Sequence, residues 1–457
     1  MAGLPQLFCE KMQDLLKDEY TDFISGYDND NYYSLRVNTL KADIGSFVQE
    51  NLFSLEKVDW CDTGFYYDNA TRPGRHPYHH AGVYYIQEAS AMAPVAAAGI
   101  QPGDKVLDLC AAPGGKSTQA AAALAGSGLL VSNEIVPSRA KILSGNLERM
   151  GVKNAIVLNE NPADLEKHFP GFFDKIIVDA PCSGEGMFRK DDTAIKEWSP
   201  RQVDVCANRQ SLILESAHKM LAPGGRLVYS TCTFAPEENE KMVASFIEKY
   251  PEYSVVRPAV HRFFSPGRPE WADGNPQLAD TMRLFPHKLK GEGHYVAVLE
   301  KNGGEKGKVK YAKTVTDKKQ LEEWYKFAKT SLKDVEFGNF VLFGTTLYSL
   351  PDNTPDFSKL KVLRVGLQLG EIKKGRFEPS HSLAMALKPQ QVKLCENLAL
   401  DDERLEKYLT GSEIPAASDA RGWCLVTAGG YSTGWGKSDG TVIKNHYPKG
   451  LRIMKSF

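Results

Sequence analysis

The middle of the chain, residues 76 to 302, alternates short β-branched runs with longer Ala/Leu-rich stretches of helical periodicity. Because this order repeats a strand followed by a helix, it predicts an α/β fold with a parallel sheet covered by helices. In such a sheet ligands bind beyond the carboxyl ends of the strands, so the residues just after each run are candidates for a functional site. The predicted strands are Val106–Cys110, Leu129–Glu134, Ala155–Asn159, Lys175–Asp179 and Arg226–Ser230, with a closing antiparallel pair that ends in Tyr295–Leu299. The predicted helices are Lys116–Leu124, Ser138–Met150, Val203–Leu221 and Glu237–Lys249.

Composition divides the rest of the chain into modules. At about 100–200 residues per domain, 457 residues predict two to four domains. Residues 1–75 form an acidic module rich in Tyr, Asp and Asn, and residues 76–302 form the α/β domain. A Gly-rich, charged linker at 301–308 then precedes two small modules, which we predict at 303–385 and 386–457.

Each outer module has its own predicted elements. The first module contains an amphipathic stretch at Leu7–Phe23 and a strand at Tyr33–Asn38. The module at 303–385 is predicted to be a small mixed domain with strands Val341–Phe343, Leu347–Leu350 and Val362–Val365. The last module is predicted to have helices around Gln390–Leu400 and Asp402–Leu409, then strands Trp423–Val426 and Thr441–Ile443 and a basic tail.

The net charge of −1 seems to argue against a nucleic-acid partner, but the charge is unevenly distributed. Residues 301–457 contain 26 basic and 18 acidic side chains, whereas residues 1–300 contain 30 and 39. Because nucleic-acid attraction depends on local patches, we expect the C-terminal modules to supply much of any attraction to RNA.

The cysteine pattern and the apolar runs indicate the compartment. The eight cysteines are scattered without a C-x-x-C pair, which predicts reduced thiols and no metal site. The longest apolar run, Ala89–Ile100, is shorter than the about 18–20 residues of a membrane span, and the segment Met1–Pro5 does not resemble a signal peptide. We therefore expect a cytoplasmic protein without a membrane partner.

One turn in the α/β region, Asp108–Ser117, joins a strand to a helix and consists mostly of small residues. Its adjacent Gly114 and Gly115 let a ligand approach the backbone, and the helix that follows offers unpaired N–H groups. The turn is not a P-loop, because Cys110 stands where the first glycine is required, and the G-x-G-x-x-G fingerprint is absent. Glu134 ends the second strand, where a carboxylate binds both hydroxyls of a ribose. Together these features predict S-adenosylmethionine, which has a ribose but no phosphate.

Two cysteines, Cys182 and Cys232, each follow an apolar strand and are expected to face the same crevice. Carbon 5 of cytosine is too weak a nucleophile to accept a methyl group unaided, so the reaction needs a thiolate that adds at carbon 6. A carboxyl group such as Asp179 could hydrogen-bond the pyrimidine edge, and the second thiol could assist product release. An adenine-type amine methyltransferase would instead have an aromatic residue at position 182. From the residues alone, either cysteine could be the nucleophile.

Several ordered motifs closely resemble the Nol/Nop/Sun family of RNA 5-methylcytosine methyltransferases. They are Leu35–Leu40, Gln87–Ser90, Asp108–Lys116, Asp179–Met187, Tyr229–Thr233 and Pro236–Glu240. The resemblance spans about residues 30–300 and implies a class I, Rossmann-like methyltransferase domain with an N-terminal α+β module. The acidic first module, residues 291–295 and the tail from Trp435 to Arg452 are similar to bacterial members that act on small-subunit ribosomal RNA. In those proteins the tail is a PUA-like RNA-binding module.

The resemblance implies a role for each matching residue. Cys232 is implied to be the nucleophile, because the family uses the later Thr-Cys motif. Cys182 is implied to promote product release, and Asp179 to contact both the cofactor and the target base. The residues implied to bind S-adenosylmethionine are Cys110, Ala111, Ala112, Pro113, Gly114, Gly115, Lys116, Glu134, Asn161 and Asp179.

One position departs from the family pattern. Where the family has an acidic residue on the adenine side of the cofactor, this chain has Asn161, with Glu160 and Asp164 as alternatives. In the tail, Trp435 and the basic residues Lys437, Lys444, Lys449 and Arg452 combine an aromatic ring with positive charge, as RNA-binding surfaces often do. Without the resemblance, the same residues fit a small folded β domain.

These features together predict an RNA cytosine-5 methyltransferase. Its expected substrate is 16S small-subunit ribosomal RNA, as free RNA or within a 30S particle, and not DNA. One alternative is the same chemistry on transfer RNA. Another is a ribosome-assembly factor that binds RNA without catalysis; the intact motifs argue against it.

Overall fold

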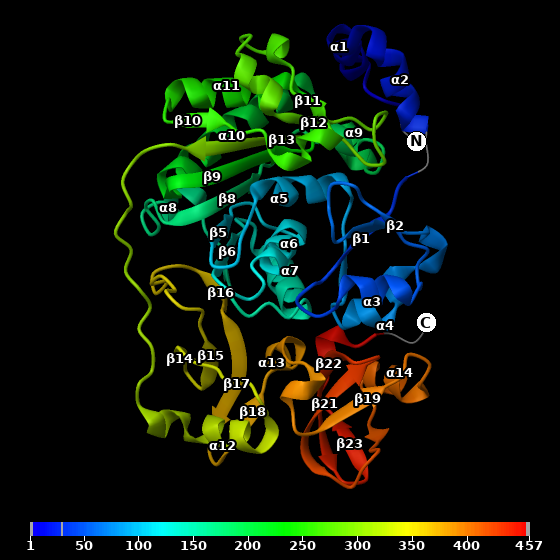
Figure 1. Ribbon diagram of the computed structural model, residues 1–457, viewed down its shortest axis with the longest axis vertical. Helices are drawn as coiled ribbons and strands as arrows, with labels where there is room; N and C mark the ends of the chain where they lie inside the picture. Colours follow the sequence, from blue (N-terminus) through cyan, green and yellow to red (C-terminus); the bar gives the residue numbers. More distant parts are fainter. Residues whose placement is uncertain (1–2, 29–30, 454–457) are drawn as a thin grey trace.

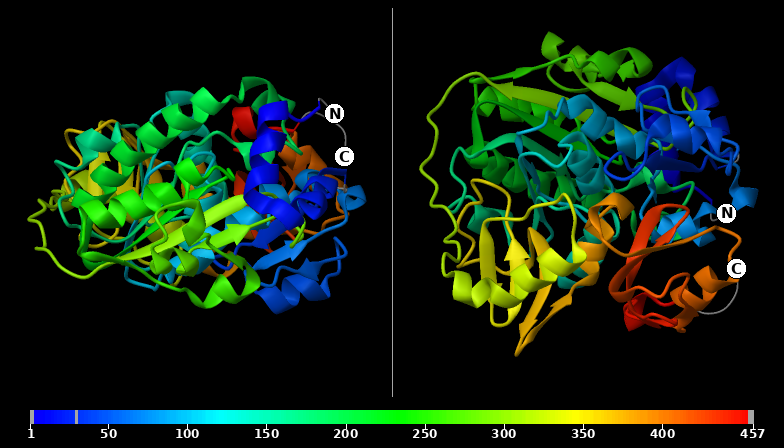
Figure 2. Two further views of the ribbon diagram at one scale, coloured as in Figure 1. Left: turned by 90° about the horizontal axis from the view of Figure 1, so that it is seen from above. Right: turned by 60° about the horizontal axis from the view of Figure 1, so that its bottom comes forward.

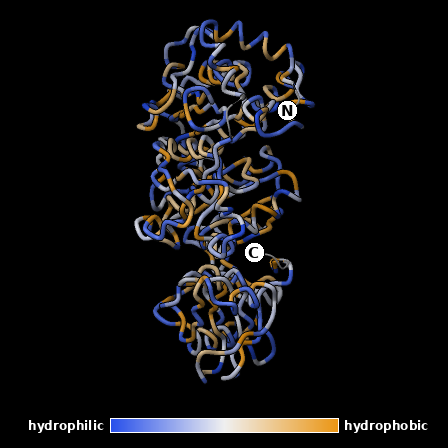
Figure 3. Tube along the Cα trace, turned by 90° about the vertical axis from the view of Figure 1, so that its right-hand side faces the viewer, coloured by the Kyte–Doolittle hydropathy of each residue, from blue (hydrophilic) through white to orange (hydrophobic). Residues whose placement is uncertain are grey.

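The protein has four β-sheets in the residues described by this computed structural model, 3–28 and 31–453. Met1 and Ala2 of the predicted start lie outside these ranges. The largest sheet occupies the upper part of the molecule, and the two C-terminal sheets lie below it (Figure 1). Viewed from the side, the molecule is elongated, with the C-terminal part joined through a narrower waist (Figure 3).

The largest sheet has ten strands in the order β11-β12-β13-β9-β8-β5-β6-β7-β16, with β10 also paired to β13. Its five central strands, from β9 to β7, run parallel, and the outer strands are antiparallel. The predicted Rossmann-like parallel sheet and its closing antiparallel strand are therefore confirmed. The strands are β5 Lys105–Asp108, β6 Leu129–Asn133, β7 Ala155–Leu158, β8 Phe173–Asp179, β9 Leu221–Thr231, β10 Tyr253–Val255, β11 Ser265–Pro266, β12 Met282–Leu284, β13 His294–Lys301 and β16 Val362–Val365.

Helices cover both faces of this sheet and bury one core on each side. The longest, α10, begins where the Ser199 side chain accepts a hydrogen bond from the Gln202 N–H at 3.2 Å, with Pro200 at the first helical position. One core packs beneath α10 and α11, and the other beneath α5, α6 and α7. The helices of this domain are α5 Ala93–Ala98, α6 Gly115–Ala123, α7 Pro137–Arg149, α8 Pro162–Leu165, α9 Asp192–Glu197, α10 Pro200–Met220 and α11 Glu240–Lys249.

The N-terminal part forms a four-stranded antiparallel sheet, β2-β3-β1-β4, and two helices that leave it. Helices α1 and α2 supply the predicted amphipathic stretch, and their apolar faces pack on Phe188, Trp198 and Phe234 of the α/β domain. The elements are α1 Gln6–Leu16, α2 Tyr20–Ser25, β1 Ser34–Val37, α3 Ile44–Gln49, β2 Glu56–Lys57, β3 Gly64–Tyr66, α4 Pro77–His80 and β4 Tyr84–Ile86.

The predicted strand Val362–Val365 is confirmed, but it does not join the other strands of the small C-terminal sheet. This segment, β16, pairs antiparallel with β7 and becomes the edge strand of the largest sheet. The free N–H and C=O groups along the edge of β7 require a partner, and a segment more than 200 residues away supplies it. Arg364 strengthens the attachment, since its Nη2 donates to the Val152 carbonyl at 2.6 Å.

The remaining C-terminal strands form two sheets. The first, β14-β15-β17-β18, confirms the predicted strands near 341–350. Its elements are α12 Glu322–Ser331, β14 Phe340–Phe343, β15 Thr346–Ser349, β17 Leu367–Lys373, β18 Arg376–Pro379 and the following α13 His381–Ala386. The second has the order β19-β21-β22-β23-β20, and its elements are β19 Cys395–Leu398, α14 Glu403–Leu409, β20 Ile414–Pro415, β21 Arg421–Ala428, β22 Tyr431–Asp439 and β23 Val442–Asn445.

The predicted helix at Gln390–Leu400 is also wrong. A short 3₁₀ turn at Pro389–Gln391 is followed by strand β19, which pairs parallel with β21. Pairing with a distant strand and burial of Leu398 therefore outweigh the local helical pattern. The helix predicted nearby is confirmed as α14. The predicted domain boundaries at 75, 302 and 385 remain predictions.

No helix within the described residues is long and apolar enough to cross a membrane. All eight cysteines lie within the described ranges, and each is a free thiol.

Candidate active site

A cavity of about 860 Å³ opens at the carboxyl ends of the parallel strands. Its wall brings together seven of the predicted site residues: Cys110, Ala112, Glu134, Asn161, Asp179, Cys182 and Cys232. The other five, Ala111, Pro113, Gly114, Gly115 and Lys116, belong to the turn and the first helical turn next to this wall. One cavity thus adjoins both the predicted cofactor site and the predicted reacting thiols.

The turn before α6 has the close packing that its small residues predict. Gly114 adopts φ 113°, and a Cβ there would lie 3.1 Å from Leu143 Cδ1, so a larger residue would strain the turn. Two side chains of α7 hold the turn's carbonyls: Arg139 Nη2 donates to Ala112 O at 2.8 Å, and Asn146 Nδ2 donates to Pro113 O at 2.9 Å. Arg139 and Asn146 therefore hold the turn in its conformation through these two hydrogen bonds.

The buried side chain of Glu134 follows β6 on the cavity wall. Its Oε1 accepts a hydrogen bond from the Val136 N–H at 2.8 Å, and its Oε2 lies 3.5 Å from Arg139 Nη1. The carboxylate is therefore oriented by two neighbours at the strand end where a ribose would lie.

Of the three candidates for the adenine-side contact, only Asn161 lines the cavity. Its Oδ1 caps α8 by accepting a hydrogen bond from the Ala163 N–H at 3.0 Å, which leaves the amide nitrogen as a free donor. Glu160 instead accepts a hydrogen bond from the Lys361 N–H at 2.7 Å, and Asp164 pairs with Lys167 at 3.2 Å.

Asp179 and Lys116 form an ion pair at the edge of the cavity, with Lys116 Nζ 2.7 Å from Asp179 Oδ2. Ser230 Oγ donates to the other carboxylate oxygen at 2.8 Å. Burial disfavours the charged carboxylate, but Lys116 and the two hydrogen bonds outweigh it and hold the pKa of Asp179 below its usual value. Asp179 therefore faces the cavity as a carboxylate with a fixed orientation.

The two cysteine thiols meet across the ends of β8 and β9. Cys182 Sγ lies 3.1 Å from Cys232 Sγ, and the backbone N–H of Cys232 points at Cys182 Sγ with an N···S distance of 3.3 Å. The hydrogen bond with Cys232 and then burial raise the pKa of the Cys182 thiol well above its usual value. Cys182 is therefore protonated and can donate a hydrogen bond to the Cys232 sulfur.

Behind Cys182, the carboxyl group of Glu238 anchors the loop that contains the thiol. It accepts hydrogen bonds from the Ser183 N–H at 3.0 Å, from the Ser183 hydroxyl, and from Gln210 Nε2 at 2.7 Å. Burial raises the pKa of Glu238 to about 7, against the smaller opposing effect of these hydrogen bonds. Glu238 lies in the Pro236–Glu240 motif, so the sequence contained this signal, although only the structure shows what the motif holds.

Two residues of the N-terminal motifs, Arg36 and Gln87, are linked by hydrogen bonds to the start of α6. The guanidinium of buried Arg36 donates to Thr118 Oγ1 at 2.7 Å and to Gly115 O at 3.2 Å, and it also donates to Gln87 Oε1 at 3.1 Å. Arg36 and Gln87 thus position the start of α6. Sequence reasoning singled out their motifs but assigned them no role.

Three other residues can now be placed. Trp435 is buried in the core between the C-terminal sheets, and its Nε1 donates to Ser380 O at 2.9 Å, so the expectation of an exposed RNA-binding aromatic ring at this position is wrong. Lys190, which follows the loop that contains Cys182, pairs with Glu292 at 3.1 Å. His294 lies in β13, opposite Leu284 of β12.

The donor set of the cavity fits S-adenosylmethionine. Glu134 offers a carboxylate for ribose hydroxyls, and Asn161 offers an amide donor on the adenine side. Lys116, the one lysine of the turn, is paired with Asp179, so the turn presents no free cation to a phosphate.

The fold and the wall of this cavity define a class I, S-adenosylmethionine-dependent methyltransferase. Residues 96–300 match the family model described as 16S rRNA methyltransferase RsmB/F. Residues 4–89, 326–387 and 395–453 match the models of the N-terminal, first C-terminal and PUA domains of the RsmF methyltransferase. The chain belongs to the ribosomal RNA small subunit methyltransferase F family, which confirms the Nol/Nop/Sun resemblance.

Individual relatives support this assignment. Ribosomal RNA small subunit methyltransferase F of Aliivibrio fischeri (strain MJ11) is 32% identical over 98% of this chain and 97% of its own. The Vibrio parahaemolyticus protein of the same name is 34% identical with the same coverage of both chains.

Solved structures resemble the methyltransferase part. A methyltransferase homolog protein from Pyrococcus horikoshii has a TM-score of 0.57 and 27% identity, covering 65% of this chain and 96% of its own. NSun6 from the same organism, in a structure with SFG, has a TM-score of 0.56 and 21% identity, covering 66% and 99%. The latter shows the fold alone.

Proposed function

We propose that this methyltransferase forms 5-methylcytidine in 16S small-subunit ribosomal RNA through a covalent bond between Cys232 and the target cytosine. The observation that carries the proposal is the pair of thiols, 3.1 Å apart, on the wall of the cavity that Asp179 also lines. One thiol is enough to form a covalent adduct with the cytosine. A second thiol at this distance supports a reaction in which that adduct must also be released.

The first step is nucleophilic addition. The thiolate of Cys232 adds to carbon 6 of the cytosine, which makes carbon 5 electron-rich. Cys182 Sγ lies 3.1 Å from Cys232 Sγ, and it accepts a hydrogen bond from the Cys232 backbone N–H at 3.3 Å. Because the Cys182 thiol is protonated, its S–H can stabilise the neighbouring thiolate.

Asp179 acts on the base itself. Its carboxylate, fixed by Lys116 and Ser230, can accept a hydrogen bond from the exocyclic amino group of the cytosine. Lys116 balances the charge of Asp179, so this acceptor stays ionised inside a partly desolvated site.

The cavity wall from Cys110 to Glu134 would bind the cofactor, with Asn161 at the adenine side. When bound, S-adenosylmethionine supplies an activated methyl group for transfer to carbon 5. Gly114 and Gly115 allow the close backbone approach, while Arg139 and Asn146 keep the turn in shape.

Release reverses the addition. After transfer, a base removes the proton from carbon 5, the carbon 5–carbon 6 double bond forms again, and the electron pair of the carbon–sulfur bond returns to Cys232. The Cys182 S–H can donate to the departing sulfur as this bond breaks. Cys182 therefore assists release in addition to stabilising the Cys232 thiolate, and release is the step that we expect to depend on it most.

The substrate assignment rests on the relatives, which are named ribosomal RNA small subunit methyltransferase F. The C-terminal match to a PUA domain supports RNA as the partner. We propose that the protein acts in the cytoplasm on this RNA, as free RNA or in the 30S particle, and not on DNA.

The experiment compares four substrates: free 16S RNA, 30S particles, transfer RNA and DNA. Each is incubated with protein and methyl-labelled cofactor; one portion is then digested to nucleosides to identify the labelled base, and an intact portion is mapped by bisulfite sequencing. We expect labelled 5-methylcytidine in 16S RNA or 30S particles. Label in transfer RNA alone would show that transfer RNA is the substrate. Cofactor binding without label in any RNA would favour a ribosome-assembly factor.

A further inference from the structure

A basic strap, residues 306–319, connects the catalytic sheet to the first C-terminal sheet. After β13 the chain runs down the outside of the molecule to α12, as the yellow-green trace shows in Figure 1 and in the right-hand view of Figure 2. Although the strap lies outside, its backbone is fixed to the C-terminal part. The N–H groups of Asp356, Ala312 and Val315 donate to Lys310 O, Thr354 O and Phe340 O at 2.7, 2.9 and 2.7 Å.

The strap also fits closely against the catalytic domain. A Cβ at Gly307 would lie 1.8 Å from Pro170 O, so only glycine can pass at this point. Val309 and Ala312 pack inward against the catalytic core. Because the backbone is fixed at several points, the side chains that point outward keep a defined spacing.

Six lysines of the strap are exposed: Lys306, Lys308, Lys310, Lys313, Lys318 and Lys319. Within the described part of the chain, no carboxylate lies within 4.0 Å of their ammonium groups, and the strap contains one acidic residue, Asp317. Lys306, Lys308 and Lys310 alternate with Gly307 and Val309, and these two intervening residues lie against the catalytic domain. The strap thus has six lysines against one carboxylate of its own. Lys310 lies near the carboxylate of Asp356, whose pKa is lowered mainly by hydrogen bonds from Ser358 and to a smaller degree by the charge of this lysine.

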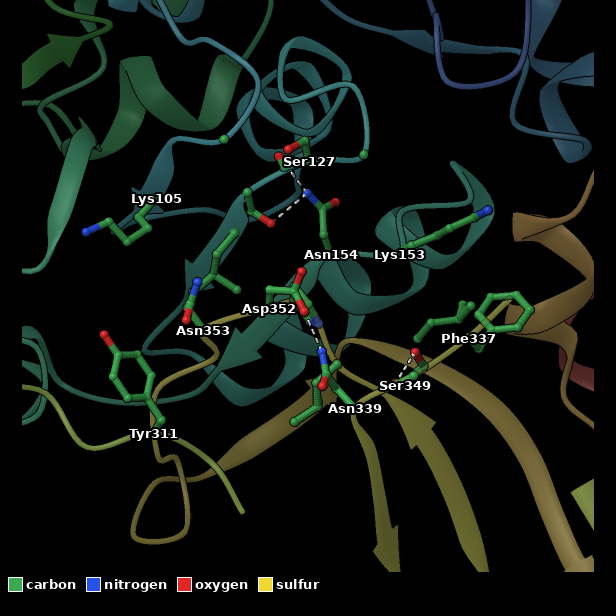
Figure 4. Close-up of a pocket in the computed structure, with 18 of the residues that line it drawn as sticks. Lys105, Ser127, Lys153, Asn154, Tyr311, Phe337, Asn339, Ser349, Asp352 and Asn353 are labelled. Carbon is green, nitrogen blue, oxygen red and sulfur yellow. Dashed lines mark hydrogen bonds between the residues drawn. The ribbon is translucent and has the colours of Figure 1, made fainter. Parts of the chain in front are cut away.

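An exposed tyrosine lies among these lysines. Tyr311 is 58% exposed and borders a groove of about 830 Å³ between the catalytic sheet and the first C-terminal sheet. Figure 4 shows Tyr311 on one side of the groove, with Lys105, Lys153 and Phe337 on other parts of its wall.

The groove combines lysines, aromatic rings and amides. Lys153 Nζ lies 5.9 Å from the centre of the Phe337 ring. The wall also includes Asp352, whose carboxylate accepts a hydrogen bond from Asn339 Nδ2 at 2.7 Å, and exposed Glu336. The groove itself is therefore close to neutral, and the excess positive charge lies on the strap.

This arrangement fits an unpaired RNA segment. A row of lysines attracts the phosphate backbone, and an exposed aromatic ring beside a roomy polar groove can stack a base. The groove lies before β5, β6 and β7, at the amino ends of the parallel strands, whereas the cavity with Cys232 lies at their carboxyl ends. The segment bound here is consequently not the one that contains the target cytosine.

We propose that the basic strap and Tyr311 form a second RNA-binding site, which holds an unpaired segment of the RNA substrate on the side of the sheet opposite the reacting thiols. The proposal deepens the proposed function and rests on RNA being the substrate. In this proposal the strap increases the affinity for a long RNA and takes no part in methyl transfer.

The test uses the full-length protein with Lys306, Lys308, Lys310 and Lys313 each changed to Gln. Its matched control changes four other exposed lysines, Lys141, Lys196, Lys329 and Lys374, to Gln; within the described residues these too have no carboxylate within 4.0 Å, so both proteins lose the same unpaired charge. Binding to a full-length 16S transcript is measured between about 50 and 200 mM salt. Melting temperature and cofactor affinity verify that both variants are folded.

We expect the strap variant to lose about tenfold or more in affinity and to have a salt slope lower by about 3, while the control changes little. Tyr311→Ala should lose about tenfold in affinity and Tyr311→Phe should not, because the phenyl ring keeps the stacking face. Photo-crosslinks from a 4-thiouridine transcript should map to the peptide around Tyr311.

Equal affinity of the strap variant and the control would overturn the proposal. The proposal would also be overturned if the strap variant bound free RNA normally but no longer bound 30S particles. The partner of the strap would then be a ribosomal protein. Failure of the proposed function has a different signature: no RNA would be methylated, whatever the binding results of these variants.

Discussion

Lys116 Nζ lies 2.7 Å from Asp179 Oδ2, and this buried lysine is the cation that keeps the carboxylate ionised at the edge of the active-site cavity. The pair joins the first turn of α6 to the end of β8. It therefore couples the cofactor side of the site to the side where the target base would lie.

Replacing Lys116 with Met should remove the positive charge that keeps Asp179 ionised. Without the cation, burial raises the pKa of Asp179 and favours the neutral acid, which is a weaker acceptor for the amino group of the base. We expect kcat to fall by about 100-fold or more and the free energy of unfolding by about 2 kcal/mol, less than for a fully buried pair because Asp179 is one-third exposed.

A double-mutant cycle provides the control for Lys116→Met. Lys116→Met combined with Asp179→Asn should be more stable than Lys116→Met alone, since no uncompensated carboxylate remains. Equal stabilities, measured by denaturant unfolding, would show that the pair does not act as a unit.

Glu134→Ala should weaken S-adenosylmethionine binding by about 10- to 100-fold, the usual effect of losing hydrogen bonds to a charged group. Isothermal titration calorimetry measures the change. The matched control is Glu160→Ala, whose carboxylate contacts Lys361 and does not line the cavity. If both variants bind the cofactor like the wild type, the ribose is held elsewhere.

The pKa of Glu238 predicts a pH-dependent stability. Its folded-state pKa of about 7 lies above the value of about 4.5 in the unfolded chain, so the folded protein favours the neutral acid. The contribution to stability is full below pH 4.5 and is lost as the pH rises through 7. From pH 5 to pH 8 we expect a loss of about 2 kcal/mol from this group.

Glu238→Gln should remove this part of the pH dependence, because the amide does not ionise. Denaturant unfolding of both proteins at pH 5 and pH 8 measures the difference. An identical pH dependence in wild type and variant would mean that the carboxyl group is already ionised in the folded protein near pH 5.

Truncation should distinguish the two C-terminal parts. Deleting residues 303–457 removes β16 from the edge of the catalytic sheet, so we expect a lower melting temperature and weaker cofactor binding as well as weaker RNA binding. Deleting residues 388–457 retains β16 and should weaken RNA binding while cofactor affinity stays within about twofold. A protein lacking 303–457 that binds the cofactor normally would show that β16 is dispensable to the site.

The sequence predicted the catalytic domain well because strand and helix signals alternate there and the site residues follow strand ends. Glu134, Asp179, Cys182 and Cys232 could be expected near one another from that order alone. The sequence also predicts β16 as a strand, but not its pairing with β7, since that pairing depends on contacts across more than 200 residues. Neither could the burial of Trp435, because an aromatic residue among lysines has the same local pattern in a core strand and on a binding surface.

The central claim is that Cys232 forms the bond to RNA and Cys182 releases it. The most direct measurement is denaturing electrophoresis of Cys182→Ala and Cys232→Ala after incubation with 16S RNA and S-adenosylmethionine. We predict a slowly migrating protein–RNA adduct for Cys182→Ala and none for Cys232→Ala or the double variant. An adduct that persists without Cys232, or normal turnover by Cys182→Ala, would contradict the assignment.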